Sequence, residues 1–283
     1  MAHPAFSPGN TALVTGAASG IGRAAAERFA ALGLHVVMVD LAGDRLDETA
    51  ASVARSAKGG RIAAMSADVS DPAAMATLAA DVAAAFGPVH VLMNNAGIQP
   101  GSALFGDVAA WDRVLAVNLH GVINGVRAFG PEMIAHGAPG AIINTGSKQG
   151  ITTPPGDPAY NLSKAGVKVF TEAVAHDLRN RPDCRITAHL LIPGFVFTPL
   201  AAGGRTEKPA DAWTPEQTVG FMMERLERGD FYILCPDNAV DRATDEKRIL
   251  WAAGDIVENR PPLSRWHPDH AAAFAAHLAG DKS

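Results

Sequence analysis

The chain has 283 residues, of which 48% are hydrophobic and 19% charged, and its formal net charge is -5. This composition supports a sizeable core, excludes a disordered chain and argues against nucleic acid or an anionic membrane as a partner. The cysteines and histidines follow no disulfide or metal-ligand spacing, and the chain has no signal-peptide pattern or membrane-length apolar run, so we expect a soluble cytoplasmic protein without a metal.

Apolar runs alternate with helical stretches along the chain. Strands are predicted over 11–15, 35–39, 61–66, 89–93, 141–145 and 186–192, with 231–234 as a seventh. Helices are predicted over 20–32, from the second strand to about 57, and over 72–86, 111–136 and 160–180. Continuous apolar strands are typical of sheets buried on both faces, and the alternation with helices indicates parallel pairing. We therefore predict one doubly wound α/β domain spanning residues 1–283.

The first predicted strand leads into a glycine-rich loop, TGAASGIG at 15–22. Glycines at 16, 20 and 22 allow a tight turn and close backbone approach to a pyrophosphate, and the helix that follows offers free N–H groups. A plain turn is the alternative, but a loop between a strand and a helix favours a dinucleotide site. Ser19 and Ile21, within the same loop, join the glycines as candidate cofactor-binding residues.

Asp40 ends the second predicted strand, where a carboxylate can accept hydrogen bonds from the ribose hydroxyls of NAD. The same charge would repel the additional phosphate of NADP, and no Arg or Lys stands at position 41 or between positions 16 and 20 to attract it. A solvated strand end or a helix cap is the simpler alternative. The glycine loop upstream favours the ribose role, so NAD is the expected cofactor.

Tyr160 and Lys164 stand four residues apart at the start of a predicted helix and therefore share one face. A free tyrosine has a pKa of about 10, and a nearby ammonium together with a positive nicotinamide ring would lower it. Ser147 follows the fifth strand, so it should reach the same edge of the sheet and hold a substrate oxygen. The alternatives are a packed aromatic, a solvated lysine and a loop hydroxyl.

These segments resemble the classical short-chain dehydrogenase/reductase family over about residues 11–198. Five motifs occur in order, namely TGAASGIG at 15–22, Asp68-Val69, NNAG at 94–97, the Ser147, Tyr160 and Lys164 set, and PGFVFT at 193–198. The resemblance implies a Rossmann-type domain with seven parallel strands in the order 3-2-1-4-5-6-7 and helices on both faces. It also implies a hydride exchange between nicotinamide and a secondary alcohol or ketone, with Tyr160 as the general acid or base.

The resemblance assigns further roles to the remaining motif residues. Asn118 would help to hold a water of a proton relay through Lys164, although it could simply bond a backbone carbonyl. Lys164 would also hold the nicotinamide ribose. Thr198 would contact the carboxamide end of the nicotinamide, although it could simply cap a helix. The other residues assigned to the cofactor are Asp68 and Val69 at the adenine, Asn94, Ala96 and Gly97 along the cleft, Val196 at the carboxamide end of the nicotinamide, and also Tyr160, Pro193 and Gly194.

Two segments after Thr198 depart from the family pattern or vary within it. Residues 199–228 should form a substrate lid, in which Trp213, Met222 and Met223 supply apolar surface, and the loop 152–158 should border the same pocket. With no Arg or Lys cluster in these pieces, we expect a bulky, mainly apolar alcohol or ketone. A C-terminal extension, about 236–283, contains Trp251 and Trp266, which should be packed. It either covers the parent domain, which we slightly prefer, or shapes the substrate pocket or a subunit contact.

Two other functions share this fold. A catalytically silent NAD-binding sensor would usually lose a catalytic residue, whereas Asn118, Ser147, Tyr160 and Lys164 are all kept. An epimerase or dehydratase on a nucleotide sugar would space its loop glycines as GxxGxxG and would normally lack NNAG. Family members are commonly homotetramers and sometimes dimers, so the resemblance implies a homotetramer, with a dimer as the alternative.

Overall fold

The computed structural model describes residues 3–280, and its centre is a parallel sheet of seven strands. The strand order is β3-β2-β1-β4-β5-β6-β7, as the sequence predicts. The strands are β1 (Thr11–Thr15), β2 (His35–Asp40), β3 (Ile62–Ser66), β4 (Val89–Asn94), β5 (Gly140–Thr145), β6 (Ile186–Ile192) and β7 (Tyr232–Leu234). The predicted strand boundaries differ from these by one residue at most, because each strand is a short apolar run that ends at glycine, proline or a polar residue.

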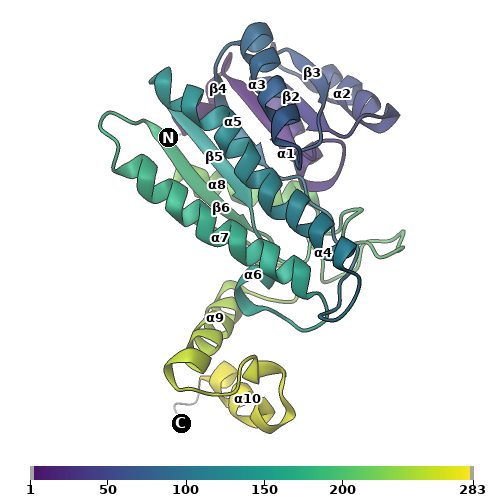
Figure 1. Cartoon of the computed structure of the whole chain (residues 1–283), viewed down its shortest axis with the longest axis vertical. Helices are drawn as coiled ribbons and strands as arrows, with labels where there is room; N and C mark the ends of the chain where they lie inside the picture. Colours follow the sequence, from purple (N-terminus) through teal and green to yellow (C-terminus); the bar gives the residue numbers. More distant parts are fainter. Residues whose placement is uncertain (1–2, 281–283) are drawn as a thin grey trace.

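Helices cover both faces of the sheet (Figure 1). On one face α1 (Gly20–Ala31), α2 (Asp44–Ser56) and α8 (Pro215–Glu227) pack against strand residues such as Val14 and Met38. On the other face α3 (Pro72–Phe86), α5 (Gly121–Ala135) and α7 (Pro158–Arg179) pack against Leu13 and Val37. Neighbouring strand residues point to opposite faces, so the strands must be apolar throughout.

The predicted helix over 111–136 is in fact interrupted. It consists of α4 (Val108–Leu115), a π-helical turn η2 (Ala116–His120) and then α5. A π turn inserts one extra residue into the helical ladder, which apolar periodicity does not reveal. A short helix α6 (Gln149–Thr152) and a short 3-10 turn η1 (Pro4–Phe6) were also not predicted.

The C-terminal extension forms a small helical unit at one end of the molecule, beside α6 (Figure 1). It contains α9 (Arg242–Val257), two short 3-10 turns, η3 (Ser264–Trp266) and η4 (Pro268–His270), and α10 (Ala271–Ala279). Trp251 is buried here, donates a hydrogen bond to Ser264 Oγ over 2.8 Å and packs edge-on against Phe274. No helix within residues 3–280 is both long and apolar enough to cross a membrane.

His189, in the middle of β6, makes folding sensitive to acid. Its ring is buried and bonded at both nitrogens, to the Asp230 carbonyl and to Thr187 Oγ1, each at 2.8 Å. Burial lowers the pKa of His189 to about 4, so the folded protein holds the neutral ring whereas the unfolded chain takes up a proton below pH 6.5. The free energy of unfolding should therefore fall as the pH falls from 6.5 to 4, by up to about 3 kcal/mol from this group.

Urea unfolding of the wild type and of His189→Gln at several pH values tests this expectation. The variant should lose this part of the pH dependence, whereas His176→Gln, which changes an exposed histidine, should keep it. An unchanged slope in the His189→Gln protein would contradict the assignment.

Candidate active site

An elongated cavity of about 590 Å³ lies along the carboxyl edge of the sheet. Its walls come from the loops after β1 through β6 and from the C-terminal extension. Parallel strands bring their carboxyl ends to the same edge, so residues far apart in the sequence meet there. The predicted site residues that line the cavity are Gly16, Ser19, Gly20, Ile21, Asp40, Asp68, Val69, Ala96, Gly97, Ser147, Tyr160, Lys164, Pro193, Gly194, Val196 and Thr198.

The glycine loop is built by close backbone contacts. Gly16 has a φ of +67°, and a Cβ there would come within 2.8 Å of Ala96 Cα. Gly22 lies behind the loop and does not line the cavity. A Cβ there would lie 2.2 Å from the Gly16 carbonyl oxygen, so the close packing requires glycine. Gly22 thus brings α1 against the loop. The Ser19 side chain at the N-cap makes no capping hydrogen bond to the first turn of α1, so backbone N–H groups of that turn can bind an anion.

Asp40 stands at one end of the cavity and fixes the loop beside it. Its carboxylate accepts hydrogen bonds from the backbone N–H of Ala18 at 3.0 Å and of Leu41 at 2.9 Å. The basic residues that line the cavity come from other segments, namely the loop after β5, α7 and the C-terminal extension, and they are Lys148, Lys164, Arg248 and Arg265. Within residues 3–280, the segments on either side of Asp40 therefore bring no basic side chain to the cavity.

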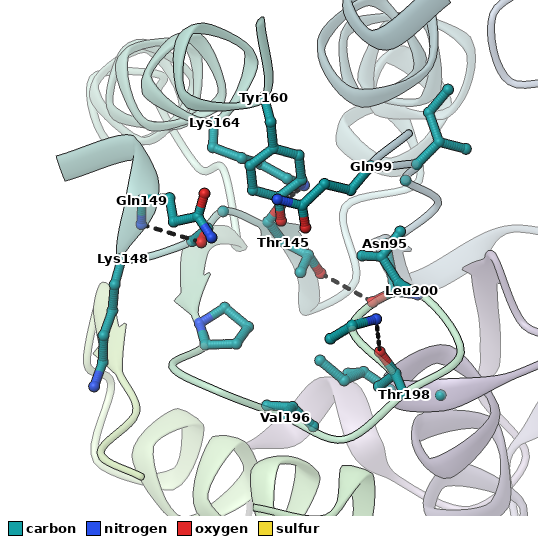
Figure 2. A pocket seen from close by; sticks show the side chains of 18 of the residues that line it. Asn95, Gln99, Thr145, Lys148, Gln149, Tyr160, Lys164, Val196, Thr198 and Leu200 are labelled. Carbon is teal, nitrogen blue, oxygen red and sulfur yellow. Dashed lines mark hydrogen bonds between the residues drawn. The ribbon is translucent and has the colours of Figure 1, made fainter. Parts of the chain in front are cut away.

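The two asparagines of the NNAG motif, Asn94 and Asn95, lie in different surroundings. Asn94 was predicted to line the cavity and does not. Its side chain is buried in the protein and donates a hydrogen bond to Asn144 Oδ1 over 2.8 Å. Asn95, which the prediction missed, lines the cavity and accepts a hydrogen bond from Thr145 Oγ1 at 3.3 Å (Figure 2). Side chains alternate along the end of a strand, so the position after the last strand residue was the one to choose.

Asn118 lies in the π turn, is fully buried and stands behind the cavity wall. Its side-chain oxygen accepts from the Ile98 backbone N–H at 2.7 Å, and its amide donates to the Ile98 carbonyl over 2.9 Å. These two bonds use the side chain to hold the strand-end loop that carries Gly97. The simpler structural role considered for Asn118, a hydrogen bond to a backbone carbonyl, is thus present in the bond to Ile98.

Tyr160 and Lys164 project from α7 toward the end of β5, where Thr145 lies (Figure 2). The Lys164 ammonium donates to the Thr145 carbonyl over 2.8 Å and lies 5.7 Å from the centre of the Tyr160 ring. Both side chains are nearly fully buried, at 7% and 4% exposed. Ser147, at the next turn of chain, accepts the backbone N–H of Gln149 at 3.1 Å. The helix and the strand end thus hold all three groups at one point.

Burial dominates the proton affinities at this point. It raises the pKa of Tyr160 to about 12, against a smaller lowering by a hydrogen bond from Ser147. It also lowers the pKa of Lys164 to about 8. The sequence predicts that Lys164 and a positive nicotinamide ring together lower the pKa of Tyr160, and in the polypeptide without the nicotinamide desolvation is the larger effect and raises it. A positive charge at the nicotinamide position would lower the pKa of Tyr160, whereas burial raises it.

The expected substrate lid is mostly structural. Met222 and Met223 lie on α8 in the buried core, and of the segment 199–228 the cavity is lined by Leu200 and Ala201. Trp213 is tied to the β6 loop by backbone hydrogen bonds, including one from its N–H to the Phe195 carbonyl over 2.9 Å. The methionine stripe of α8 was therefore a core stripe, the usual meaning of such a pattern.

The loop 152–158 and the C-terminal extension border the same cavity. Thr152 and Pro154 line it from the loop, as predicted, and the residues that line it from the extension are Asp237, Asp245, Arg248, Arg265 and Trp266. Trp266 was expected to be packed, but its side chain is 42% exposed. The extension therefore shapes the pocket, which was the less favoured of the two predictions.

Comparison with known proteins agrees with this geometry. Residues 10–209 match the family described as short chain dehydrogenase. The chain is 31% identical over 261 residues to 1-deoxy-11-beta-hydroxypentalenate dehydrogenase of Streptomyces exfoliatus, covering 90% of this chain and 93% of that protein. It is 39% identical over 217 residues to galactitol 2-dehydrogenase (L-tagatose-forming) of Cereibacter sphaeroides, covering 75% of this chain and 82% of that protein.

A solved structure of the same family has a similar fold. The fold is similar to that of a short chain dehydrogenase/reductase from Burkholderia phymatum in complex with NAD, with a TM-score of 0.81, 31% identity and coverage of 91% of this chain and 97% of that one. The sequence match covers the strand-end loops after β1 through β6, which build most of the cavity wall, and it ends before the C-terminal extension. The chain therefore belongs to the short-chain dehydrogenase family of oxidoreductases.

Proposed function

We propose that the protein is an NAD-dependent dehydrogenase or reductase that interconverts a secondary alcohol and its ketone. The observation that carries this proposal is the convergence of Ser147, Tyr160 and Lys164 on one cavity that also contains the glycine loop and Asp40. The nicotinamide, when bound, accepts or supplies the hydride. The uncapped start of α1 and the carboxylate of Asp40 fit the pyrophosphate and the ribose of such a dinucleotide.

The residues of the chain manage the proton. Tyr160 would take the proton of the substrate hydroxyl during oxidation and return it during reduction. Ser147, whose hydroxyl acts to lower the pKa of Tyr160, would hold the substrate oxygen beside the phenol. Lys164, held by the Thr145 carbonyl, places a positive charge near the phenolate that oxidation requires. Asn118 would position the loop beside Lys164 and, by the family pattern, help to pass the proton to solvent.

The pocket beside Tyr160 favours a bulky substrate. Its described walls include Pro154, Phe195, Leu200 and Trp266, which offer apolar surface on several sides. Galactitol 2-dehydrogenase and the hydroxypentalenate dehydrogenase each act, by name, on hydroxyl-bearing molecules of different character. The walls of this cavity support a secondary alcohol with a substantial hydrophobic part.

Replacing Tyr160 with Phe removes the proton-transfer group with little change in shape. We expect turnover of a panel of secondary alcohols and ketones to fall by about 100- to 10,000-fold, while binding of NADH, followed by its fluorescence, stays near normal. Tyr232→Phe is the matched control, because Tyr232 is the other tyrosine of the chain and lies half exposed at the sheet edge. Near-normal turnover in the Tyr160 variant would overturn the assignment, and binding without turnover in the wild type would indicate a sensor.

Replacing Asp40 with Ser removes the carboxylate proposed to hold the ribose diol. The KM for NAD should rise by about tenfold or more, as expected for loss of hydrogen bonds to a charged group, and the discrimination against NADP should shrink. Asp47→Ser, which removes an exposed carboxylate from α2, is the control and should change neither constant. A wild type that prefers NADP would contradict the role given to Asp40.

We also propose a homotetramer, with α7 as part of an interface. Leu162 and Val169 lie on this helix seven residues apart and are 51% and 64% exposed, so they form an apolar strip on one side of it. Val169→Glu should reduce the assembled species seen by sedimentation velocity, with an unchanged circular dichroism spectrum. A wild type that sediments as a monomer at micromolar concentration would contradict this proposal.

A further inference from the structure

The C-terminal extension brings two arginines to the cavity that holds Tyr160. Arg248 lies on α9 and Arg265 on η3, and both line that cavity beside Trp266. Both lie outside residues 10–209, which match the family. They belong to the extension, and they bring positive charge to a pocket that the lid segments were expected to make apolar.

Both guanidinium groups lack an acidic partner among residues 3–280, in which no carboxylate oxygen lies within 4.0 Å of either. The Nε of Arg248 is moreover buried without a hydrogen-bond partner. Arg260, in the same extension, shows the usual arrangement, with Asp255 at 2.9 Å and Glu258 at 2.6 Å. A buried donor without an acceptor is costly, so this one is well placed to receive an acceptor from a ligand.

Arg265 is held in place by aromatic rings. Its guanidinium lies 4.3 Å from the centre of the Trp266 ring and 5.3 Å from that of Phe274. Partial burial and the nearby charge of Arg248 lower the pKa of Arg265 to about 10, which leaves it protonated at neutral pH. Two like charges placed together in a partly buried site repel, and an anion between them would relieve that repulsion.

A buried ion cluster fixes this part of the extension to the active-site loop. Lys148, the residue after Ser147, pairs with Asp245 of α9 at 2.6 Å and with Asp237 at 3.3 Å. Lys148 points away from Tyr160 in Figure 2, so it ties the loop to the extension instead of facing the reacting carbon. With both carboxylates and all three cations ionised, the cluster of these residues and the arginines keeps one positive charge in excess. One excess charge suits a monoanion better than a phosphate dianion.

We propose that Arg248 and Arg265 form a subsite for a carboxylate of the substrate. A planar guanidinium presents paired N–H donors that match the two oxygens of a carboxylate. The substrate would then be a hydroxy acid or keto acid, with its alcohol carbon at Tyr160, an apolar body along Phe195 and Trp266, and its carboxylate at the extension. This inference rests on the proposed oxidoreductase function and names the class of its substrate.

Binding of matched acids and esters tests the subsite without relying on turnover. The probes are 4-oxopentanoate, 4-acetylbenzoate and 7-oxooctanoate, each compared with its methyl ester, titrated by calorimetry into protein saturated with NAD⁺, which cannot reduce a ketone. In the wild type, at least one acid should bind about 10- to 100-fold more tightly than its ester, as expected for hydrogen bonds to a charged group. Arg248→Gln and Arg265→Gln should each remove most of this preference and leave the affinity for the ester unchanged.

Arg242→Gln is the matched control, because Arg242 lies exposed on the same helix and pairs with Glu246 at 2.7 Å, outside the cavity. It should keep the full preference for the acid. Equal binding of acids and esters by the wild type, failure of every acid to bind, or a preference that survives both cavity variants would overturn the subsite.

The same ketones, tested with NADH, separate this inference from the function on which it rests. Acid preference in binding without turnover of any ketone would contradict the oxidoreductase proposal and support the subsite. Turnover of the ketones with no difference between acid and ester would support the oxidoreductase and overturn the subsite.

Discussion

The chemistry of this molecule depends on the burial of its parallel sheet on both faces. Strands whose side chains are apolar on both sides can place polar groups only where they end. Six successive strand ends therefore contribute to one cavity, and helices on both faces hold those ends in place. The extension adds a further wall at the end where Ser147 and Lys148 lie.

The same burial shifts the pKa values of Tyr160 and Lys164 toward their neutral forms. A phenol in an apolar setting keeps its proton, as the pKa of about 12 indicates, and the buried ammonium of Lys164 tends to lose one, with a pKa of about 8. Each group is thus driven toward neutrality by desolvation, and each would be favoured in its charged form by the other. Opposed pKa shifts of this kind, in a cavity, are typical of functional sites.

The sequence alone predicted the sheet and most of the site, because strong local signals mark both. Apolar runs bounded by glycine and proline define the strands, and the spacing of Tyr160 and Lys164 on one helix face brings them together with Ser147 at the strand edge. Where the signal was weaker, the predictions were less accurate. Asn94 and Asn95 are adjacent and chemically identical, and only the end of the strand decides which faces the cavity.

Other features required the tertiary structure. The Met222 and Met223 stripe is equally consistent with a core helix or a lid, and packing against α1 determines that it is core. Arg248 and Arg265 are separated by a proline-containing turn and belong to no motif, so no spacing rule could predict that they share a cavity with Tyr160. The Lys148 ion pairs that bring them there join residues far apart in the chain.

If hydride and proton transfer both take place in this one cavity, oxidation of an alcohol there must break its carbinol C–H bond, and an isotope effect measures that step. The best secondary alcohol found in a panel should be offered with NAD both in its ordinary form and with deuterium on the carbinol carbon, and NADH formation followed by its absorbance. We expect NADH to form in equal amount to the product ketone, with a primary isotope effect on the chemical step. Bound NAD without any absorbance change, in either direction and with any alcohol or ketone, would contradict it.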